Sequence, residues 1–246
     1  MEDFKNNFSA RRDEIYAFLK TMKLLEKNEL DNPGSFSAYL QQGANSDEEP
    51  IPTYIMIANI LKSDLALMLY NYIEFSVSGL LDLIYDYVQN DSLCFSKVST
   101  DIQTLWRSKE LKATNDPTSN FSTHLKINKR MIDHVLNECI IELSARDTIS
   151  GGNLDYNHID RAFKNHGMNI VAGSAIFREN RFSNLLDRIK RDRNSLAHGA
   201  TSFEESLRDK TIQELLSNME DITQFLLDLI EITSNYLEAK KYQAVV

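Results

Sequence analysis

The sequence predicts an all-α protein, a bundle of long helices, and three observations support that prediction. All four prolines lie before residue 118, so no proline interrupts a helix in the second half of the chain. Apolar residues recur at helical spacing over several long segments. The 246 residues, 42% of them hydrophobic, are enough to bury a sizeable core. Long helices joined by loops favour a helical bundle.

The N-terminal part, residues 1–52, is expected to hold one helix and a long loop. Residues 32–52 contain Pro, Gly, Asn and Ser, which are typical of loops. Residues 53–89 are strongly apolar and predict a long helix that opens a core bundle over 53–246, and we expect a single domain spanning 1–246. The N-terminal helix is predicted over 9–30 from the helical spacing of Ile15, Phe18, Leu19, Met22 and Leu25.

Shorter helices are predicted in the middle of the chain. After a polar break near residues 90–96, an amphipathic segment covers 100–111, and the loop ATNDPTSN follows it. Residues 124–146 have a helical apolar period. The stretch SGGNLDYN should break that helix, after which a short helix is expected from an Asp155 cap to Asn165.

The C-terminal part is expected to hold two more helices. Gly167 is a C-terminal stop for the short helix before it, and the apolar residues 168–177 fit either a strand or a helical turn. A helix over 182–198 should end at Gly199, and a long C-terminal helix is predicted over 209–241.

Charge is unevenly distributed along this acidic chain, whose formal net charge is −9. Residues 161–193 have a local net charge of +5 and residues 204–238 one of −7. An acidic chain is a poor nucleic-acid coat protein, although a single basic groove remains compatible with it. The two cysteines cannot form a disulfide framework, and no apolar stretch is expected to span a membrane or act as a signal peptide. We therefore expect a reduced cytoplasmic protein without membrane contact.

The most informative segment is RNSLAHG, residues 193–199. Asn194 and His198 are four residues apart and share a helix face, with Arg193 about 100° round from it. Gly199 as a stop would place His198 at the helix end, where backbone carbonyls are unsatisfied. His198 can act as general acid or base, and Arg193 can stabilise charge that develops on phosphorus. These residues suit phosphodiester cleavage without a metal.

The specificity of this motif comes from its asparagine. A bare Arg-x4-His is expected about 0.24 times by chance in this composition, and Arg-Asn-x3-His about 0.02 times. A second match, from Arg161 to His166 and followed by Gly167, lacks the adjacent Asn and lies on a shorter predicted helix. We therefore prefer the match at Arg193 and His198.

RNSLAHG, preceded by a basic amphipathic helix and followed by a long helix, resembles the HEPN superfamily. These proteins are helical bundles with a motif of Arg, a polar residue, about three further residues and His. The chain is also similar to bacterial HEPN nucleases of defence and toxin–antitoxin systems, in the helix LMLYNYIEFSV, the SGGNLD turn and AHGATSFEE. The resemblance implies a HEPN-type bundle with two long core helices and a long C-terminal helix.

The resemblance also implies a function, an endoribonuclease in which the RNA 2′-hydroxyl attacks its own phosphate without a metal. The products would be a 2′,3′-cyclic phosphate and a 5′-hydroxyl. A homodimer would join two Arg/His pairs in one site, and a neutralising antitoxin protein or an incomplete resting site would restrain a toxic nuclease. The alternative is a non-catalytic HEPN-like adaptor or antitoxin-type subunit, which would use the acidic 204–238 segment to bind a partner such as a nucleotidyltransferase.

Several other residues are candidates for supporting roles. Asn71, Glu74 and Ser78 form a polar stripe on an apolar helix, where an unpaired carboxylate is costly. Glu74, assisted by Asn71, would orient Arg193 or His198, or else the stripe is a structural polar network. The basic residues Arg188, Lys190 and Arg191 flank the motif and would either hold RNA phosphates or form an exposed surface.

The remaining polar and aromatic residues give weaker signals. His124, His134, His158 and His166 have no second ligand at metal spacing, and no cofactor or metal is expected. Gly151 and Gly152 follow no predicted strand, which disfavours a phosphate-binding loop. The aromatic residues are expected in the core rather than on a base-stacking surface; these are Tyr70, Tyr72, Phe75, Tyr85, Tyr87 and Trp106.

Overall fold

The computed structural model describes residues 1–43, 52–112, 120–149, 154–170 and 180–245. Within these residues the secondary structure is helical, and the only β-structure consists of two isolated bridges, Cys94 with Ile140 and Val98 with Gln243. The predicted all-α fold class is confirmed. The chain divides into two compact units, each containing residues from distant parts of the sequence. Both units contain parts of the long helices α3 (Tyr54–Asn90) and α9 (Ile212–Glu238).

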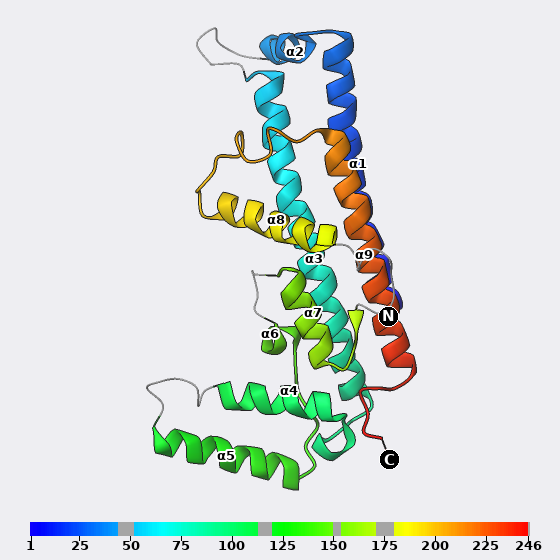
Figure 1. Cartoon of the computed structure of the whole chain (residues 1–246), viewed down its shortest axis with the longest axis vertical. Helices are drawn as coiled ribbons and strands as arrows, with labels where there is room; N and C mark the ends of the chain where they lie inside the picture. The colour runs from blue at the N-terminus through cyan, green and yellow to red at the C-terminus, as the bar shows by residue number, and fades with distance from the viewer. Residues whose placement is uncertain (44–51, 113–119, 150–153, 171–179, 246) are drawn as a thin grey trace. The chain divides into compact units, whose positions relative to one another are not determined.

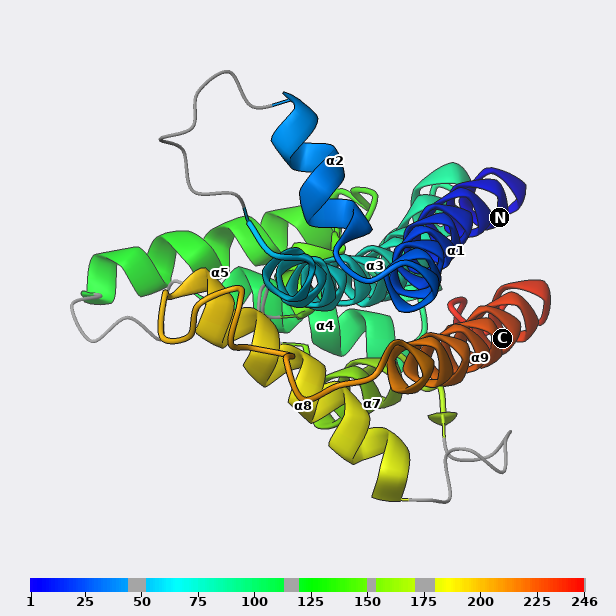
Figure 2. The same cartoon turned by 90° about the horizontal axis from the view of Figure 1, so that it is seen from above.

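Unit 2 comprises Glu2–Ile73 and Arg181–Gln224. Its N-terminal part holds α1 (Glu2–Asp31) and the short α2 (Ser35–Gly43). In Figures 1 and 2, α1 runs alongside the first halves of α3 and α9, and α8 (Asn180–Ala197) crosses α3. Apolar side chains from all four helices form the core of the unit, among them Phe8, Ile15, Leu19, Leu65, Leu69, Tyr72, Leu186, Ile189, Met219 and Ile222.

Unit 1 comprises Met1, Glu74–Asn180 and Phe225–Val246. The second half of α3 provides its most deeply buried residues, and α7 and α9 contribute further ones; the set includes Leu80, Leu81, Ile84, Ile159, Phe163, Leu226 and Leu229. The shorter elements of the unit, shown in Figure 1, are the 3₁₀ helix η1 (Phe95–Lys97), α4 (Thr100–Leu111), α5 (Phe121–Leu136), α6 (Ala145–Thr148) and α7 (Tyr156–Asn165).

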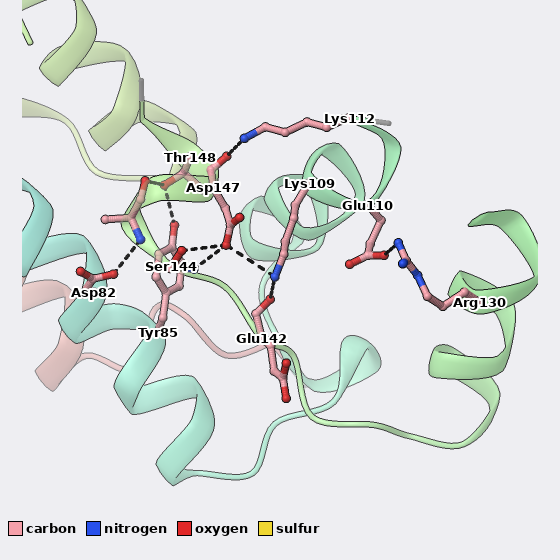
Figure 3. Close-up of polar contacts among 11 residues, drawn as sticks. Asp82, Tyr85, Lys109, Glu110, Lys112, Arg130, Glu142, Ser144, Asp147 and Thr148 are labelled. Carbon is pink, nitrogen blue, oxygen red and sulfur yellow. Dashed lines mark hydrogen bonds and ion pairs between the residues drawn. The ribbon is translucent and has the colours of Figure 1, made fainter. Parts of the chain in front are cut away.

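A network of polar contacts holds α4 and α6 together in unit 1, as Figure 3 shows. The Ser144 and Asp147 side chains form a capping box at the start of α6. Lys109 of α4 lies 3.5 Å from the Asp147 carboxylate and donates to the backbone carbonyl of Glu142. On α3, Asp82 accepts a 2.6 Å hydrogen bond from the backbone N–H of Ala145. These contacts fix the segment that follows α5.

Most of the predicted helices are confirmed. The predicted 53–89, 100–111, 182–198 and 209–241 helices correspond to α3, α4, α8 and α9, with ends within a few residues. The side chain of Asp155 accepts a 2.9 Å hydrogen bond from the backbone N–H of His158 and caps α7, as expected. The N-terminal helix begins at Glu2 rather than residue 9. The short helix ends at Asn165, as predicted.

Two predictions of secondary structure are wrong. The expected loop over 32–52 contains α2, which contacts α1. The expected helix over 124–146 ends at Leu136, because the backbone after it pairs elsewhere: Ile140 forms a bridge with Cys94, and the N–H of Ile141 donates to the Leu93 carbonyl over 3.0 Å. Three other predictions concern segments wholly or partly outside the described residues, namely the loop at 113–120, the break SGGNLDYN at 150–157 and the apolar segment 168–177.

No apolar stretch was expected to approach the length of a membrane span, but α3 contains one. By length and composition, α3 is apolar enough to cross a bilayer. Half of the most apolar part of this helix is buried within the protein. The same burial explains why α3 carries apolar residues on most of its sides.

A buried histidine connects α7 to α3 in unit 1. His166 is fully buried, and its Nε2 lies 2.5 Å from the Tyr85 hydroxyl. Its Nδ1 lies 2.7 Å from the Ala162 carbonyl, which can only accept, so Nδ1 carries a proton and the neutral ring accepts at Nε2. Burial lowers the pKa of His166, against the opposing effects of the Ala162 hydrogen bond and the Asp101 charge.

This lowered pKa predicts a stability that falls in acid. The unfolded chain binds one more proton than the folded chain below the ordinary histidine pKa of 6.5. The contribution of His166 is therefore complete above that pH and is lost as the pH decreases, by up to about 1.4 kcal/mol per pH unit. Urea unfolding at several pH values between about 5 and 8 should show a shallower pH dependence for His166→Gln than for the wild type. His124→Gln is the control, and equal slopes for His166→Gln and the wild type would disprove this account.

Candidate functional site

The end of α8 has the geometry that the motif predicts. Gly199 adopts a positive φ of 67°, a conformation favourable to glycine. The N–H of Gly199 donates to the Leu196 carbonyl over 3.1 Å, and the N–H of Ala200 donates to the Ser195 carbonyl over 2.9 Å. This pair of bonds is a Schellman motif, which satisfies the last carbonyls of the helix. It places His198, whose side chain is exposed, directly at the helix end.

Arg193 is held by two neighbours within unit 2. Its Nη1 donates a 3.0 Å hydrogen bond to Oδ1 of Asn194. Its guanidinium carbon lies 4.8 Å from the centre of the Tyr70 ring, which is a cation–π distance. Tyr70 belongs to the buried core, with 1% of the residue exposed, so the guanidinium rests on the surface of the core. Arg193 itself is half-buried, and the next residue of the motif helps to orient it.

The sequence of α8 explains why this end of the helix faces outward. Its buried residues form one apolar face, since each lies three, four or seven residues from at least one other; they are Phe182, Leu185, Leu186, Ile189 and Leu196. Arg193 falls on this same face, four residues after Ile189 and three before Leu196, which agrees with its contact with the buried Tyr70. His198, at the end of the helix, is exposed instead.

Positive charge surrounds a half-buried carboxylate on α8. Burial raises the pKa of Asp192, while the nearby charges of Arg188, Arg191 and Lys210 oppose that rise. Arg191 is exposed, whereas Arg188 and Lys190 are half-buried. The predicted phosphate-contact residues thus lie on the same helix as the motif, and part of their charge neutralises Asp192.

The chain after the motif is attached to α3 within unit 2. The hydroxyl of Ser63, which is fully buried, donates to the Phe203 carbonyl over 2.6 Å. The ammonium of Lys62 donates to the Arg208 carbonyl over 3.3 Å. The AHGATSFEE segment is consequently anchored as a turn rather than continuing α8.

The two predicted supporting residues of α3 belong to different units. Asn71 is exposed and lies in unit 2, close in sequence to Tyr70. Glu74 is half-buried and lies in unit 1, where it lines a pocket of about 440 Å³ together with Ser78, Asp82 and Arg146. The expected orienting role of Glu74 toward Arg193 or His198 therefore stays a prediction.

The second sequence match differs from the first in burial rather than in local geometry. Gly167 also has a positive φ, of 76°, and the N–H groups of Gly167 and Met168 close α7 with a Schellman pair. His166 at that end is, however, buried against Tyr85, while Arg161 is exposed. Of the two matches, only the one on α8 presents its histidine to solvent.

Tyr70 and Lys210 are candidate site residues that the sequence did not point to. Six aromatic residues were expected in the core, and of these Tyr70, Tyr72, Tyr85 and Trp106 are buried, whereas Phe75 and Tyr87 are half-buried. The contact between Tyr70 and Arg193 joins two segments more than a hundred residues apart, for which no local pattern exists. Lys210 lies in the turn segment between α8 and α9, and it reaches the basic cluster only through the fold. Among the described residues, no group of three or more His, Cys, Asp or Glu side chains is arranged to hold a metal ion.

The helical fold and the Arg-Asn-x3-His motif at a helix end together define an all-α protein of the HEPN type. A family model described as HEPN_MAE_28990-like HEPN matches residues 2–242, almost the whole chain. The protein therefore belongs to this HEPN family, whose domains are generally associated with nucleases. No match was found among curated proteins or among solved structures.

Proposed function

We propose that this HEPN protein is a metal-independent endoribonuclease that acts as a toxin or antiphage effector in the cytoplasm. The observation that supports the proposal most directly is the end of α8. His198 is exposed there. Five residues before it, the guanidinium of Arg193 contacts the Tyr70 ring and donates a hydrogen bond to Asn194. An exposed imidazole can transfer protons and a fixed guanidinium can stabilise charge on phosphorus, and metal-free phosphodiester cleavage can use both.

The proposed reaction is an attack by the 2′-hydroxyl oxygen of RNA on the adjacent phosphorus. The P–O5′ bond breaks, the 2′-hydroxyl proton passes to a base, and the leaving 5′ oxygen receives a proton from an acid. His198 serves in one of these proton transfers, and Arg193 stabilises the negative charge on the phosphoryl oxygens. The products are a 2′,3′-cyclic phosphate and a 5′-hydroxyl, and water is not consumed.

A homodimer would supply the second proton-transfer group. The motif contributes one histidine per chain, while the reaction needs both an acid and a base. Two copies that bring their α8 ends together would form one composite cleft containing two His198 and two Arg193 side chains. Arg188, Lys190 and Arg191 would then hold RNA phosphates on either side, without reading bases. A neutralising partner protein would restrain the toxic form.

The test of this proposal is RNA cleavage by the purified protein in EDTA. We expect cleavage to persist in the chelator and to leave fragments with cyclic phosphate ends, identified by mass spectrometry of the products. Light scattering should give the mass of a dimer. Loss of cleavage in EDTA, or fragments that carry 5′-phosphates, would rule out this mechanism.

The alternative function is that of a non-catalytic adaptor with an acidic docking face. Exposed acidic residues on α9, including Glu214, Glu220 and Glu231, are the observation in its favour. Overexpression separates the two proposals. Growth arrest that His198→Ala relieves indicates the nuclease, and unaffected growth with either protein indicates the adaptor.

Tyr70 is expected to act as a positioning residue for Arg193. Tyr70→Phe keeps an aromatic face under the guanidinium and should retain most of the kcat for RNA cleavage, whereas Tyr70→Leu removes the face and should lower kcat about 3- to 30-fold. KM should change less than kcat, because the interaction matters most when charge develops on phosphorus. Circular dichroism checks folding, and equal kcat for the Phe and Leu variants would contradict the positioning role.

A further inference from the structure

The helix α5 in unit 1 has an apolar stripe that the described residues leave uncovered. Ile127 is the only buried residue of α5, and the helix contacts α4. On another side, four large apolar side chains project into solvent at spacings of four, seven and four residues. Their exposed fractions are 77% for Phe121, 53% for Leu125, 58% for Ile132 and 74% for Leu136.

A cationic pocket lies beside this stripe on the same helix. Lys126, Lys129 and Arg130 line a hollow of about 430 Å³, together with Asp133, His134, Asn137 and Cys139. Figure 3 shows Arg130 directed toward Glu110 of α4, with which it forms an ion pair. Neither Lys126 nor Lys129 forms an ion pair with any described residue. The pocket therefore offers positive charge to an incoming group.

We propose that α5 is a docking surface for an acidic amphipathic helix of a partner protein. The stripe runs along a helix of 16 residues, about 24 Å long, which matches the apolar face of a second helix of three to four turns. Acidic side chains flanking the apolar face of that partner would meet Lys126 and Lys129, and one would enter the pocket between them. Charge complementarity thus selects an acidic partner, and the apolar stripe supplies the contact area.

RNA and a second copy of the chain fit the surface less well, and the vesicle measurement below distinguishes a membrane. RNA would use the lysines, but three of the four stripe residues are aliphatic and cannot stack on bases as aromatic side chains do. A membrane of anionic lipids would accept the stripe and bring headgroup phosphates to the lysines, so its binding is compared directly with that of the peptide. A second copy of the chain, paired through α5 with α5, would bring the lysines of the two helices toward each other.

The experiment measures binding of a fluorescent synthetic peptide by anisotropy. The probe is a helix of three heptads with Leu at the a and d positions and Glu elsewhere, and its counterpart has Lys in place of Glu. We expect the acidic peptide to bind the full-length protein and the basic peptide not to bind. The double variants Leu125→Glu/Ile132→Glu and Lys126→Glu/Lys129→Glu should each weaken acidic-peptide binding by at least about tenfold.

The sharpest result is a charge swap. Lys126→Glu/Lys129→Glu should gain binding to the basic peptide, since the charge beside the stripe is then reversed. Matched controls change exposed residues of α1, with Lys5→Glu/Lys20→Glu for charge and Leu24→Glu/Leu30→Glu for the apolar substitution. These controls should bind the acidic peptide as the wild type does, and circular dichroism should show folded protein throughout.

Several results would overturn the proposal. The acidic peptide would not bind the wild type, or the α1 controls would weaken its binding as much as the α5 variants do. Alternatively, Lys126→Glu/Lys129→Glu would not gain binding to the basic peptide. If phosphatidylglycerol vesicles bound through α5 more tightly than the peptide, the ligand would be a membrane. If a single-stranded RNA did so, the ligand would be RNA. A dimer mass that falls to that of a monomer in Leu125→Glu/Ile132→Glu would instead assign the stripe to a second copy.

Discussion

Replacing His198 by alanine is expected to lower the kcat for RNA cleavage by about 10²- to 10⁴-fold, the usual contribution of a positioned general acid or base. The side chain is exposed at the end of α8 and forms no part of the core, so its removal should change the free energy of unfolding by less than about 0.5 kcal/mol. The backbone hydrogen bonds of Gly199 and Ala200 that close the helix do not involve the imidazole. The loss of activity should therefore occur in a fully folded protein.

The measurement is single-turnover cleavage of a defined RNA in EDTA, with a urea unfolding curve for each variant. His124→Ala, on α5, is the matched control and should cleave at the wild-type rate. Equal cleavage by His198→Ala and the wild type would remove His198 from the mechanism. In that case the nuclease proposal would lose its acid–base group.

Arg193→Ala is expected to lower kcat by about 10²- to 10³-fold, because a fixed charge that stabilises the transition state would be lost. Arg193→Lys should recover only part of this activity. An ammonium keeps the positive charge, but it lacks the planar group that packs on Tyr70 and donates to Asn194. A partial recovery of kcat in Arg193→Lys would indicate that cleavage needs the planar geometry of the guanidinium as well as its positive charge.

The control for Arg193 is provided by the second sequence match. Arg161→Ala removes an exposed arginine from an equivalent position of an Arg-x4-His-Gly sequence on α7, and it should leave kcat unchanged. Rates are measured as for His198, with RNA binding followed separately by anisotropy. If Arg193→Ala weakened only binding and left kcat intact, Arg193 would be a phosphate contact rather than a catalytic residue.

Much of the fold was predictable from local patterns. The apolar period defined α3, α8 and α9, and the side chain of Asp155 identified the start of α7. The errors came from interactions between distant segments. Residues 137–144 have an apolar content that suits a helix, but the pairing of Ile140 and Ile141 with Leu93 and Cys94 ends α5 at Leu136. The composition of residues 32–52 suggested a loop, but part of this segment forms α2, which contacts α1.

The candidate site was predictable only in part, for the same reason. Arg193, Asn194 and His198 lie within six residues of one another in the sequence. Their position at the end of a helix follows from Gly199, whose positive φ ends α8. Tyr70 could not be assigned, because a buried aromatic residue on an apolar helix looks the same whether or not a guanidinium lies on it. The relation of Glu74 to the motif depends on how α3 is placed, which no spacing in the sequence encodes.

By itself, the sequence determined the helical class, the helix ends at Gly167 and Gly199, and the membership of the chain in a HEPN-type group. It also offered two histidines in the same local setting, since hydrogen bonds within one helical turn depend only on neighbouring residues. The tertiary structure alone gives them different surroundings. It buries His166 against Tyr85, where a neutral ring is favoured, and it leaves His198 exposed on the same helix as an arginine that rests on the core.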